Sequence, residues 1–156
     1  MIPERVVTQA EMSAIEADVL KYCEDNVNEV KDCSNKQKKK IWDRFSVVVS
    51  CSNGQAIKHS HSQKNSSFEK HLEMKLSSIG TIGEKRYTRC GLLICPNIIG
   101  SCAEPNAANL LLKATGSTMI DDIVFSNAYR PRCVLKGKTN AIIPPCQNCK
   151  DTFITL

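Results

Sequence analysis

Two short cysteine motifs, far apart in the sequence, constrain what this chain can fold into. The first reads Cys102-Ala103-Glu104 and the second reads Pro145-Cys146-Gln147-Asn148-Cys149. Three thiolates can hold one Zn²⁺ and leave its fourth coordination position open to water, which is the catalytic arrangement of this metal. A carboxylate two residues after the first thiolate can then act on that water. We therefore expect the fold to bring the two motifs together.

The length and composition are those of one globular domain. The chain has 156 residues, enough to bury a core without help from disulfides or metal. We interpret it as a single domain over 1–156, with an N-terminal helix and basic linker in 1–40 and the core in 41–156. The sequence has no apolar run near the roughly 18 residues of a membrane span and no signal-peptide pattern at its start. We therefore expect no membrane partner and a cytoplasmic location, with a secreted effector domain that acts in a target cell as the alternative.

Charge is unevenly distributed, although the net charge of +5 is mild. Acidic residues dominate the first 30 positions, and a basic cluster follows them. This basic cluster consists of Lys31, Lys36, Lys38, Lys39, Lys40 and Arg44, set against Asp32 and Asp43. Such a cluster can track the phosphates of a nucleic acid or can be a solvated turn, and the sequence leaves both readings open.

Hydrophobic periodicity predicts a layered α/β domain. The expected helices are 7–32, 68–79, 101–115 and 146–156, and the expected strands lie within 41–51, 55–61, 87–95 and 119–127. Polar or basic connections are expected at 34–40 and 128–140. Thr8 and Glu11 form a capping-box pattern at the first helix, Asn53-Gly54 is typical of a hairpin turn, and Gly116 is suited to end the third helix.

The cysteines of the motifs are predicted to lie at helix starts, where the positive end of the helix dipole lowers a thiol's pKa. Cys146 and Cys149 are three residues apart and so share one helix face. Ser101 and Glu104 also resemble a capping box, which would put Pro105 where it forfeits a hydrogen bond; a helix that starts near Glu104 is the alternative. Three thiolates around Zn²⁺ carry excess negative charge, so a nearby cation such as Lys150, Arg130 or Arg132 is expected.

The paired motif resembles the zinc-site signature of the cytidine deaminase-like superfamily. The resemblance implies an α/β/α three-layer sandwich with a central mixed sheet. It implies that Cys102, Cys146 and Cys149 are Zn²⁺ ligands and that Glu104 shuttles protons while an amino group leaves as ammonia. It also implies that the backbone at Ala103 and the carbonyl of Pro144 hold the base.

The same motifs differ from those of enzymes that act on free nucleosides. Those enzymes carry an arginine where this chain has Pro105, and an Asn-x-Glu where this chain has Asn97 without the acid. The Cys-Ala-Glu-Pro start and the Pro-Cys-x-Asn-Cys pair look more like the deaminase domains of bacterial polymorphic toxins. That resemblance implies a nucleic-acid or nucleotide target and an immunity protein as a partner. We therefore expect hydrolytic deamination of cytosine in DNA or RNA by a toxin domain.

Two other functions remain open at this stage. One is a deaminase of free cytidine or nucleotides, and the other is a non-enzymatic binding module with a structural four-cysteine zinc site. In that module Cys90, Cys95 or Cys133 would supply the fourth ligand, and Glu104 would only cap a helix. For the enzyme, the predicted substrate contacts are Ala103, Pro144, Asn97, Tyr129, Arg130 and Arg132, with Tyr129 as a stacking candidate and the arginines as phosphate contacts or solvated loop charges.

Overall fold

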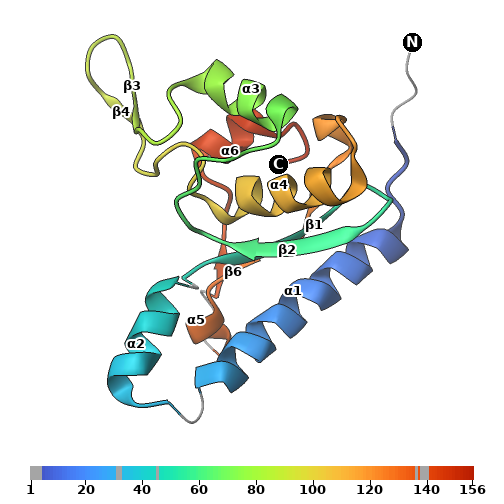
Figure 1. Ribbon diagram of the computed structural model, residues 1–156, viewed down its shortest axis with the longest axis vertical. Coiled ribbons are helices and arrows are strands. Elements are labelled where there is room, and N and C mark those ends of the chain that lie inside the picture. Colours follow the sequence, from blue (N-terminus) through green and yellow to red (C-terminus); the bar gives the residue numbers. More distant parts are fainter. Residues whose placement is uncertain (1–4, 31–32, 45, 136, 138–140) are drawn as a thin grey trace.

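The computed structural model describes residues 5–30, 33–44, 46–135, 137 and 141–156 (Figure 1). The helices are α1 (Gln9–Val30), α2 (Asn35–Arg44), α3 (Lys70–Ile79), α4 (Ala103–Thr115), α5 (Pro131–Leu135) and α6 (Gln147–Thr152), and a 3₁₀ turn, η1, spans Ile120–Asp122. The strands are β1 (Val48–Ser52), β2 (Ile57–His61), β3 (Arg86–Tyr87), β4 (Leu93–Cys95), β5 (Val124–Phe125), β6 (Ala128–Tyr129) and β7 (Ile142–Ile143). The fold is thus a mixture of helices and sheet, as the sequence predicts at this level.

The main sheet runs in the order β2-β1-β6-β7, with β5 also paired to β1. The pairings among the described strands of this sheet are antiparallel. We expected a mixed sheet, and the parallel pairings that this expectation includes are wrong. The tight turn at Asn53-Gly54, where Gly54 takes a φ of 84°, makes β1 and β2 an antiparallel hairpin, and β5, β6 and β7 also pair antiparallel.

Helices α1 and α4 pack on opposite faces of this sheet (Figure 1). Alternation along β1 explains the arrangement, since all five of its residues are buried. Val49 and Cys51 join the large core with α4, whereas Val48 packs with Val19 and Cys23 of α1. A strand covered on both faces is expected to be apolar throughout, as β1 largely is.

The predicted first helix is confirmed as α1, and its expected cap is present. The Glu11 backbone N–H donates to the Thr8 hydroxyl at 3.1 Å, and Ile15, Val19 and Cys23 are buried against the sheet. The helices predicted at 68–79 and 101–115 are confirmed as α3 and α4. Gly116 ends α4 in the left-handed conformation, with a φ of 71°.

Segment 34–40, which we expected to be a linker, forms most of helix α2 instead. Ser34 and Gln37 cap its start reciprocally: the Gln37 N–H donates to the Ser34 hydroxyl at 3.3 Å, and the Ser34 N–H donates to the Gln37 side chain at 3.1 Å. Lysine and glutamine also have high helix propensity. Because α2 continues to Arg44, the strand predicted within 41–51 begins only at Val48. Lys31 and Asp32 of the basic cluster lie outside the described residues.

Residues 119–129 do not form the single strand and loop that we expected. The 3₁₀ turn η1 takes the first part, and β5 covers only Val124–Phe125. The register against β1 then slips by one residue, since Cys51 faces Phe125 but Val48 faces Tyr129. Ser126 fills the irregularity, because its hydroxyl accepts from the Ser50 N–H at 3.0 Å. This bulge reverses which face the following side chains occupy.

A small hairpin of β3 and β4 projects from the body of the molecule (Figure 1). It confirms the strand predicted within 87–95 but belongs to its own two-stranded sheet. The basic loop predicted at 128–140 contains β6 and α5, and its residues 136 and 138–140 lie outside the described residues. The last predicted helix is confirmed as the shorter α6. Among the described residues, no helix is long and apolar enough to cross a membrane.

Candidate metal centre

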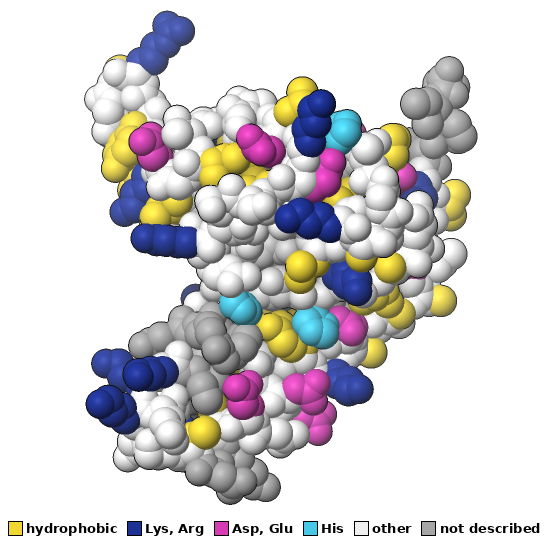
Figure 2. Space-filling view, in the orientation of Figure 1, with side chains coloured by type: hydrophobic (Ala, Val, Ile, Leu, Met, Phe, Trp, Pro, Cys, Tyr) yellow, Lys and Arg dark blue, Asp and Glu magenta, His cyan; other side chains and the backbone are white. Residues whose placement is uncertain are grey.

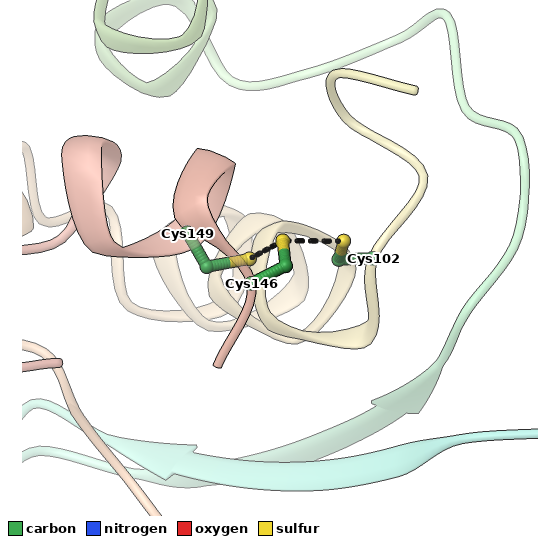
Figure 3. A group of neighbouring side chains, drawn as sticks. All are labelled: Cys102, Cys146 and Cys149. Carbon is green, nitrogen blue, oxygen red and sulfur yellow. Dashed lines mark hydrogen bonds between the residues drawn. The ribbon is translucent and has the colours of Figure 1, made fainter. Parts of the chain in front are cut away.

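The three cysteines of the two motifs converge, as the sequence predicts (Figure 3). The Sγ atoms of Cys102 and Cys146 are 3.4 Å apart, and those of Cys146 and Cys149 are 3.6 Å apart. All three sulfurs lie within 4.8 Å of one another. Thiolates 2.3 Å from a tetrahedral Zn²⁺ would be about 3.8 Å apart. The three sulfurs are therefore close enough to hold one metal ion.

Helix capping positions these ligands. Cys102 is the N-cap of α4 and Cys146 is the N-cap of α6, both in extended conformation, and neither uses its side chain as a cap. The sulfurs are thus free to point at each other. The predicted capping box of Ser101 and Glu104 is wrong, because the helix starts one residue later than that pattern requires. Pro105 consequently occupies the third helical position, where its missing N–H costs no intrahelical hydrogen bond.

Glu104 lies beside this cluster in a buried position. Only 6% of the residue is exposed, and the Cys149 thiol donates to its Oε2 at 3.6 Å. Burial raises the pKa of the Glu104 carboxyl, and the nearby Cys146 raises it further. A carboxyl whose pKa is moved toward neutrality can both accept and donate a proton under ordinary conditions.

The sulfurs influence each other's protonation strongly. The hydrogen bonds that Cys146 shares with Cys102 and then with Cys149 lower its pKa. The contact with Cys146 raises the pKa of Cys102, and contacts with Cys102 and Cys146 together with burial raise the pKa of Cys149. Because the three thiols lie so close together, one of them can be a thiolate while the other two stay protonated, unless a cation is present. Bound metal removes that restriction, because it deprotonates the thiols that coordinate it.

A cavity of about 460 Å³ opens directly above the cluster. Its walls include four groups of residues: Ser46 and Val47; Ser62, Gln63 and Lys64; Lys85, Pro96, Asn97 and Ile98; and Ser101, Cys102, Ala103, Glu104, Ala128, Ile143, Pro144 and Cys146. The predicted substrate contacts Ala103, Pro144 and Asn97 are therefore brought together with the proton-transfer candidate and two of the thiols. The cavity is large enough for one nucleobase, since ligand sites start near 300 Å³.

Buried asparagines fix the cavity walls. Asn106 of α4 donates through Nδ2 to the carbonyls of Cys102 and Gln63 at 2.9 and 3.1 Å. Asn148, between the two cysteines of α6, donates to the carbonyl of Asn97 at 2.8 Å and accepts from Arg86 at 3.3 Å. Each asparagine thus links a helix that carries cysteines of the cluster to a loop that lines the cavity.

Three predicted contacts are not brought to the cavity. The bulge at Ser126 turns Ala128 toward the cavity and Tyr129 toward α1, where its hydroxyl donates to Glu16 at 2.8 Å. Arg130 and Arg132 are exposed at β6 and α5 and do not line the cavity. Lys150 is likewise exposed on α6 and does not line it. The cations on the cavity wall are Lys64 and Lys85, which sequence reasoning missed because neither lies near a motif.

None of the remaining cysteines that the structure describes lies close enough to the cluster to be a fourth ligand. Among the described residues, the ligand group contains Cys102, Cys146 and Cys149 without Cys90, Cys95 or Cys133. Cys95 is buried in β4, whereas Cys90 is exposed at the tip of the hairpin. All nine cysteines are free thiols in the structure. The cluster is therefore a three-cysteine group of which Cys102 and Cys146 line an open cavity.

Comparison of the chain with protein-family models, with curated proteins and with solved structures gave no match.

Proposed function

We propose that this protein is a zinc-dependent hydrolase that deaminates a nucleobase, with cytosine in DNA or RNA as its substrate. One observation carries the proposal: three convergent sulfurs lie beside a buried carboxyl, and this carboxyl and two of the thiols line an open cavity. A structural site would need a fourth protein ligand. Cys102 and Cys146 instead line the cavity, which supports a fourth ligand that comes from solvent.

Zn²⁺ is the metal that this donor set fits. Thiolates are soft ligands that select zinc among the divalent ions of cells, and sulfur separations of 3.4 and 3.6 Å suit its small tetrahedral shell. Cys102, Cys146 and Cys149 would hold it. When bound, Zn²⁺ supplies a Lewis acid that lowers the pKa of a water molecule at the open position.

The protein's own groups divide the remaining work. Glu104 takes a proton from the attacking water and returns it to the departing amine, a role supported by its raised pKa and its place on the cavity wall. Ala103 and Pro144 offer backbone groups that hold the base in plane. Asn97 keeps its loop against α6 through the hydrogen bond from Asn148, so its side chain is held at the cavity wall.

The proposed architecture and toxin role rest on the resemblance of the cysteine motifs to the cytidine deaminase-like superfamily. We propose the three-layer architecture of the cytidine deaminase-like superfamily, which the placement of α1 and α4 on opposite faces of the sheet supports. The toxin role, the immunity protein as partner and action inside a target cell belong to this proposal.

The test is base conversion by the zinc-loaded protein. Cytosine-containing DNA, RNA and free cytidine are incubated with wild type, Glu104→Gln and the control Glu84→Gln, and uracil is measured by mass spectrometry. Glu84 is exposed and does not line the cavity. Loss of a general acid–base group costs about 10²- to 10⁴-fold in rate, so Glu104→Gln should lose at least that much while Glu84→Gln keeps full activity. Full activity in Glu104→Gln would refute the mechanism.

The alternatives give different results in the same experiment. Conversion of free cytidine without conversion of DNA or RNA would assign a nucleoside or nucleotide deaminase. No conversion of any substrate, together with a four-thiolate absorption spectrum after Co²⁺ substitution, would assign a structural zinc site in a binding module. Neither Arg130 nor Arg132 is needed for the proposal, since neither lines the cavity.

A further inference from the structure

Two elements stand on either side of the cavity mouth. Ser46 and Val47, which follow α2, form part of one wall, and Lys85 and Pro96, which flank the β3–β4 hairpin, form part of the other. In Figure 2 the left side of the molecule is hollowed between the hairpin region above and α2 below. The cavity therefore opens into a groove whose two banks are α2 and the hairpin.

Both banks carry positive charge. On α2, Lys36, Lys39 and Lys40 are exposed, and Figure 2 shows Lys and Arg side chains gathered over α2 and around the hairpin. At the mouth itself, Lys64 and Lys85 are exposed and line the cavity. In the described part of the chain, neither of these two forms an ion pair. These five lysines, here called the mouth lysines, lie on α2 (Lys36, Lys39 and Lys40) and at the cavity rim (Lys64 and Lys85).

The hairpin adds exposed flat and apolar surface to this charge. Tyr87 is 57% exposed and Leu92 is 68% exposed. Proteins that bind single-stranded nucleic acid without reading sequence combine a cationic groove with aromatic side chains on which bases stack. Tyr87 lies two residues after Lys85 and so falls on the same bank.

The site's depth limits what form of nucleic acid can be used. Glu104 is only 6% exposed, at the floor of a cavity of about 460 Å³. A base inside an intact duplex cannot reach such a position, so it has to be flipped out or come from a single strand. The mouth lysines lie outside that cavity or at its rim, where the sugar-phosphate backbone of the same strand would pass.

We propose that a single strand of nucleic acid lies across the cavity mouth between α2 and the hairpin, an inference that rests on the proposed function. The mouth lysines Lys36, Lys39, Lys40, Lys64 and Lys85 hold its phosphates, and a base beside the target stacks on Tyr87. The target base then enters the cavity toward Glu104. The chemistry recognised is that of an unpaired polynucleotide, whether its sugar is deoxyribose or ribose.

The test measures binding separately from turnover. Fluorescence anisotropy of labelled cytosine-containing single-stranded DNA and RNA oligonucleotides is recorded across a salt series, with the DNA duplex as a third probe. The variant Lys36→Gln/Lys39→Gln/Lys40→Gln is compared with the control Lys21→Gln/Lys70→Gln/Lys75→Gln, which removes the same charge from α1 and α3, at two exposed positions and the half-buried Lys75. A second pair compares Lys64→Gln/Lys85→Gln with wild type.

Each phosphate contact with a single strand contributes about 0.7 to the slope of log affinity against log salt. The α2 variant should therefore lose about 2 from that slope and about 100-fold in affinity at 0.1 M salt. The Lys64→Gln/Lys85→Gln variant should lose about 1.4, and the control should stay close to wild type. Tyr87→Ala should weaken binding by about 5- to 100-fold without changing the slope.

The inference is overturned if the control loses as much slope as the α2 variant, or if the duplex binds more tightly than either single strand. Equal binding of single-stranded DNA and RNA would support the inference. Preference for one of them would also support it and would name the sugar. Failure of this inference is distinguishable from failure of the proposed function. Conversion of cytosine in oligonucleotides, with binding that the lysine variants and Tyr87→Ala leave unchanged, would refute the groove alone. Oligonucleotide binding with the predicted slopes, but no base conversion, would refute the deaminase alone.

Discussion

Replacement of Asn106 by alanine tests how the cavity wall is connected to the candidate metal centre. Asn106 is 2% exposed. Its Nδ2 donates to the carbonyls of Cys102 at 2.9 Å, Gln63 at 3.1 Å and Gly100 at 3.4 Å, and its Oδ1 accepts from Asn65 at 3.1 Å. One side chain therefore connects the first residue of the metal motif to the loop on the cavity rim.

The magnitude follows from these bonds. An amide has two N–H donors, so the two shorter donated bonds and the accepted one count fully. Each hydrogen bond contributes about 0.5–1.5 kcal/mol, and each buried partner left unpaired costs about 1–3 kcal/mol. Asn106→Ala should thus lower the free energy of unfolding by about 3 kcal/mol, which corresponds to a Tm lower by about 6–12 °C for a domain of this size.

The assay is urea and thermal unfolding with zinc present and with a chelator. Asn65→Ala is the matched control, because it removes one of the same hydrogen bonds from a half-buried position and should cost about 1 kcal/mol. Since Asn106 holds the carbonyl of a ligand residue, its loss should also weaken zinc binding by about 10- to 100-fold. A loss of stability below that of Asn65→Ala, with unchanged zinc affinity, would refute the reasoning.

Three further changes test other parts of the site. Burial raises the pKa of Glu104, so the folded protein loses stability as pH rises and this carboxyl has to ionise, whereas glutamine stays neutral. Glu104→Gln should therefore stabilise the metal-free protein more at about pH 8 than at about pH 5. A difference in Tm that does not change with pH would contradict this. Cys149→Ser should abolish stoichiometric zinc binding, measured by elemental analysis, because a hydroxyl is a poor zinc ligand, while Cys90→Ser, at an exposed cysteine outside the cluster, should retain it; equal zinc loss in both would exclude the cluster as the site. Gly100 has a φ of 89°, and a Cβ there would lie 3.1 Å from the Phe68 ring, so Gly100→Ala should destabilise the protein by about 1–3 kcal/mol; Gly91→Ala, with a φ of 80° but open space, should cost less, and equal costs would show that the ring contact is unimportant.

The convergence of the three cysteines and Glu104 could be predicted from the sequence because these residues carry their own signal. The signal consists of local patterns: a thiol at a helix start, a carboxyl two residues later, and a pair of cysteines on one helical turn. The structure brings Cys102, Cys146, Cys149 and Glu104 together as predicted. The start of α4 was harder to predict, since Ser101 and Cys102 compete as N-cap and only the extended conformation of Cys102 decides between them.

The rest of the cavity depended on long-range structure. Lys64 and Lys85 come from two loops that are separated by α3, so no spacing in the sequence joins them. Tyr129 was predicted for the cavity because its neighbours are basic, but the bulge at Ser126 shifts the alternation by one residue and turns Tyr129 to the α1 face. A one-residue irregularity in a short strand has no clear sequence signature, yet it reverses every side chain after it.

The linker predicted at 34–40, where the structure has helix α2, is wrong for a different reason. Its lysine-rich sequence has no apolar stripe, so periodicity favoured a linker. The signals that identify it are the capping pair Ser34 and Gln37 and the helix propensity of its residues. These local signals therefore identify the helix, and with it one bank of the groove, where periodicity does not.

The most direct test of a catalytic three-thiolate zinc site is X-ray absorption spectroscopy of the purified protein with its metal content measured in parallel. We predict one zinc per chain, with three sulfur ligands at about 2.3 Å and one oxygen ligand at about 2.0 Å. Four sulfur ligands would mean a structural site in which Glu104 has no chemical role. Protein that takes up no zinc when supplied with it would contradict the account as a whole.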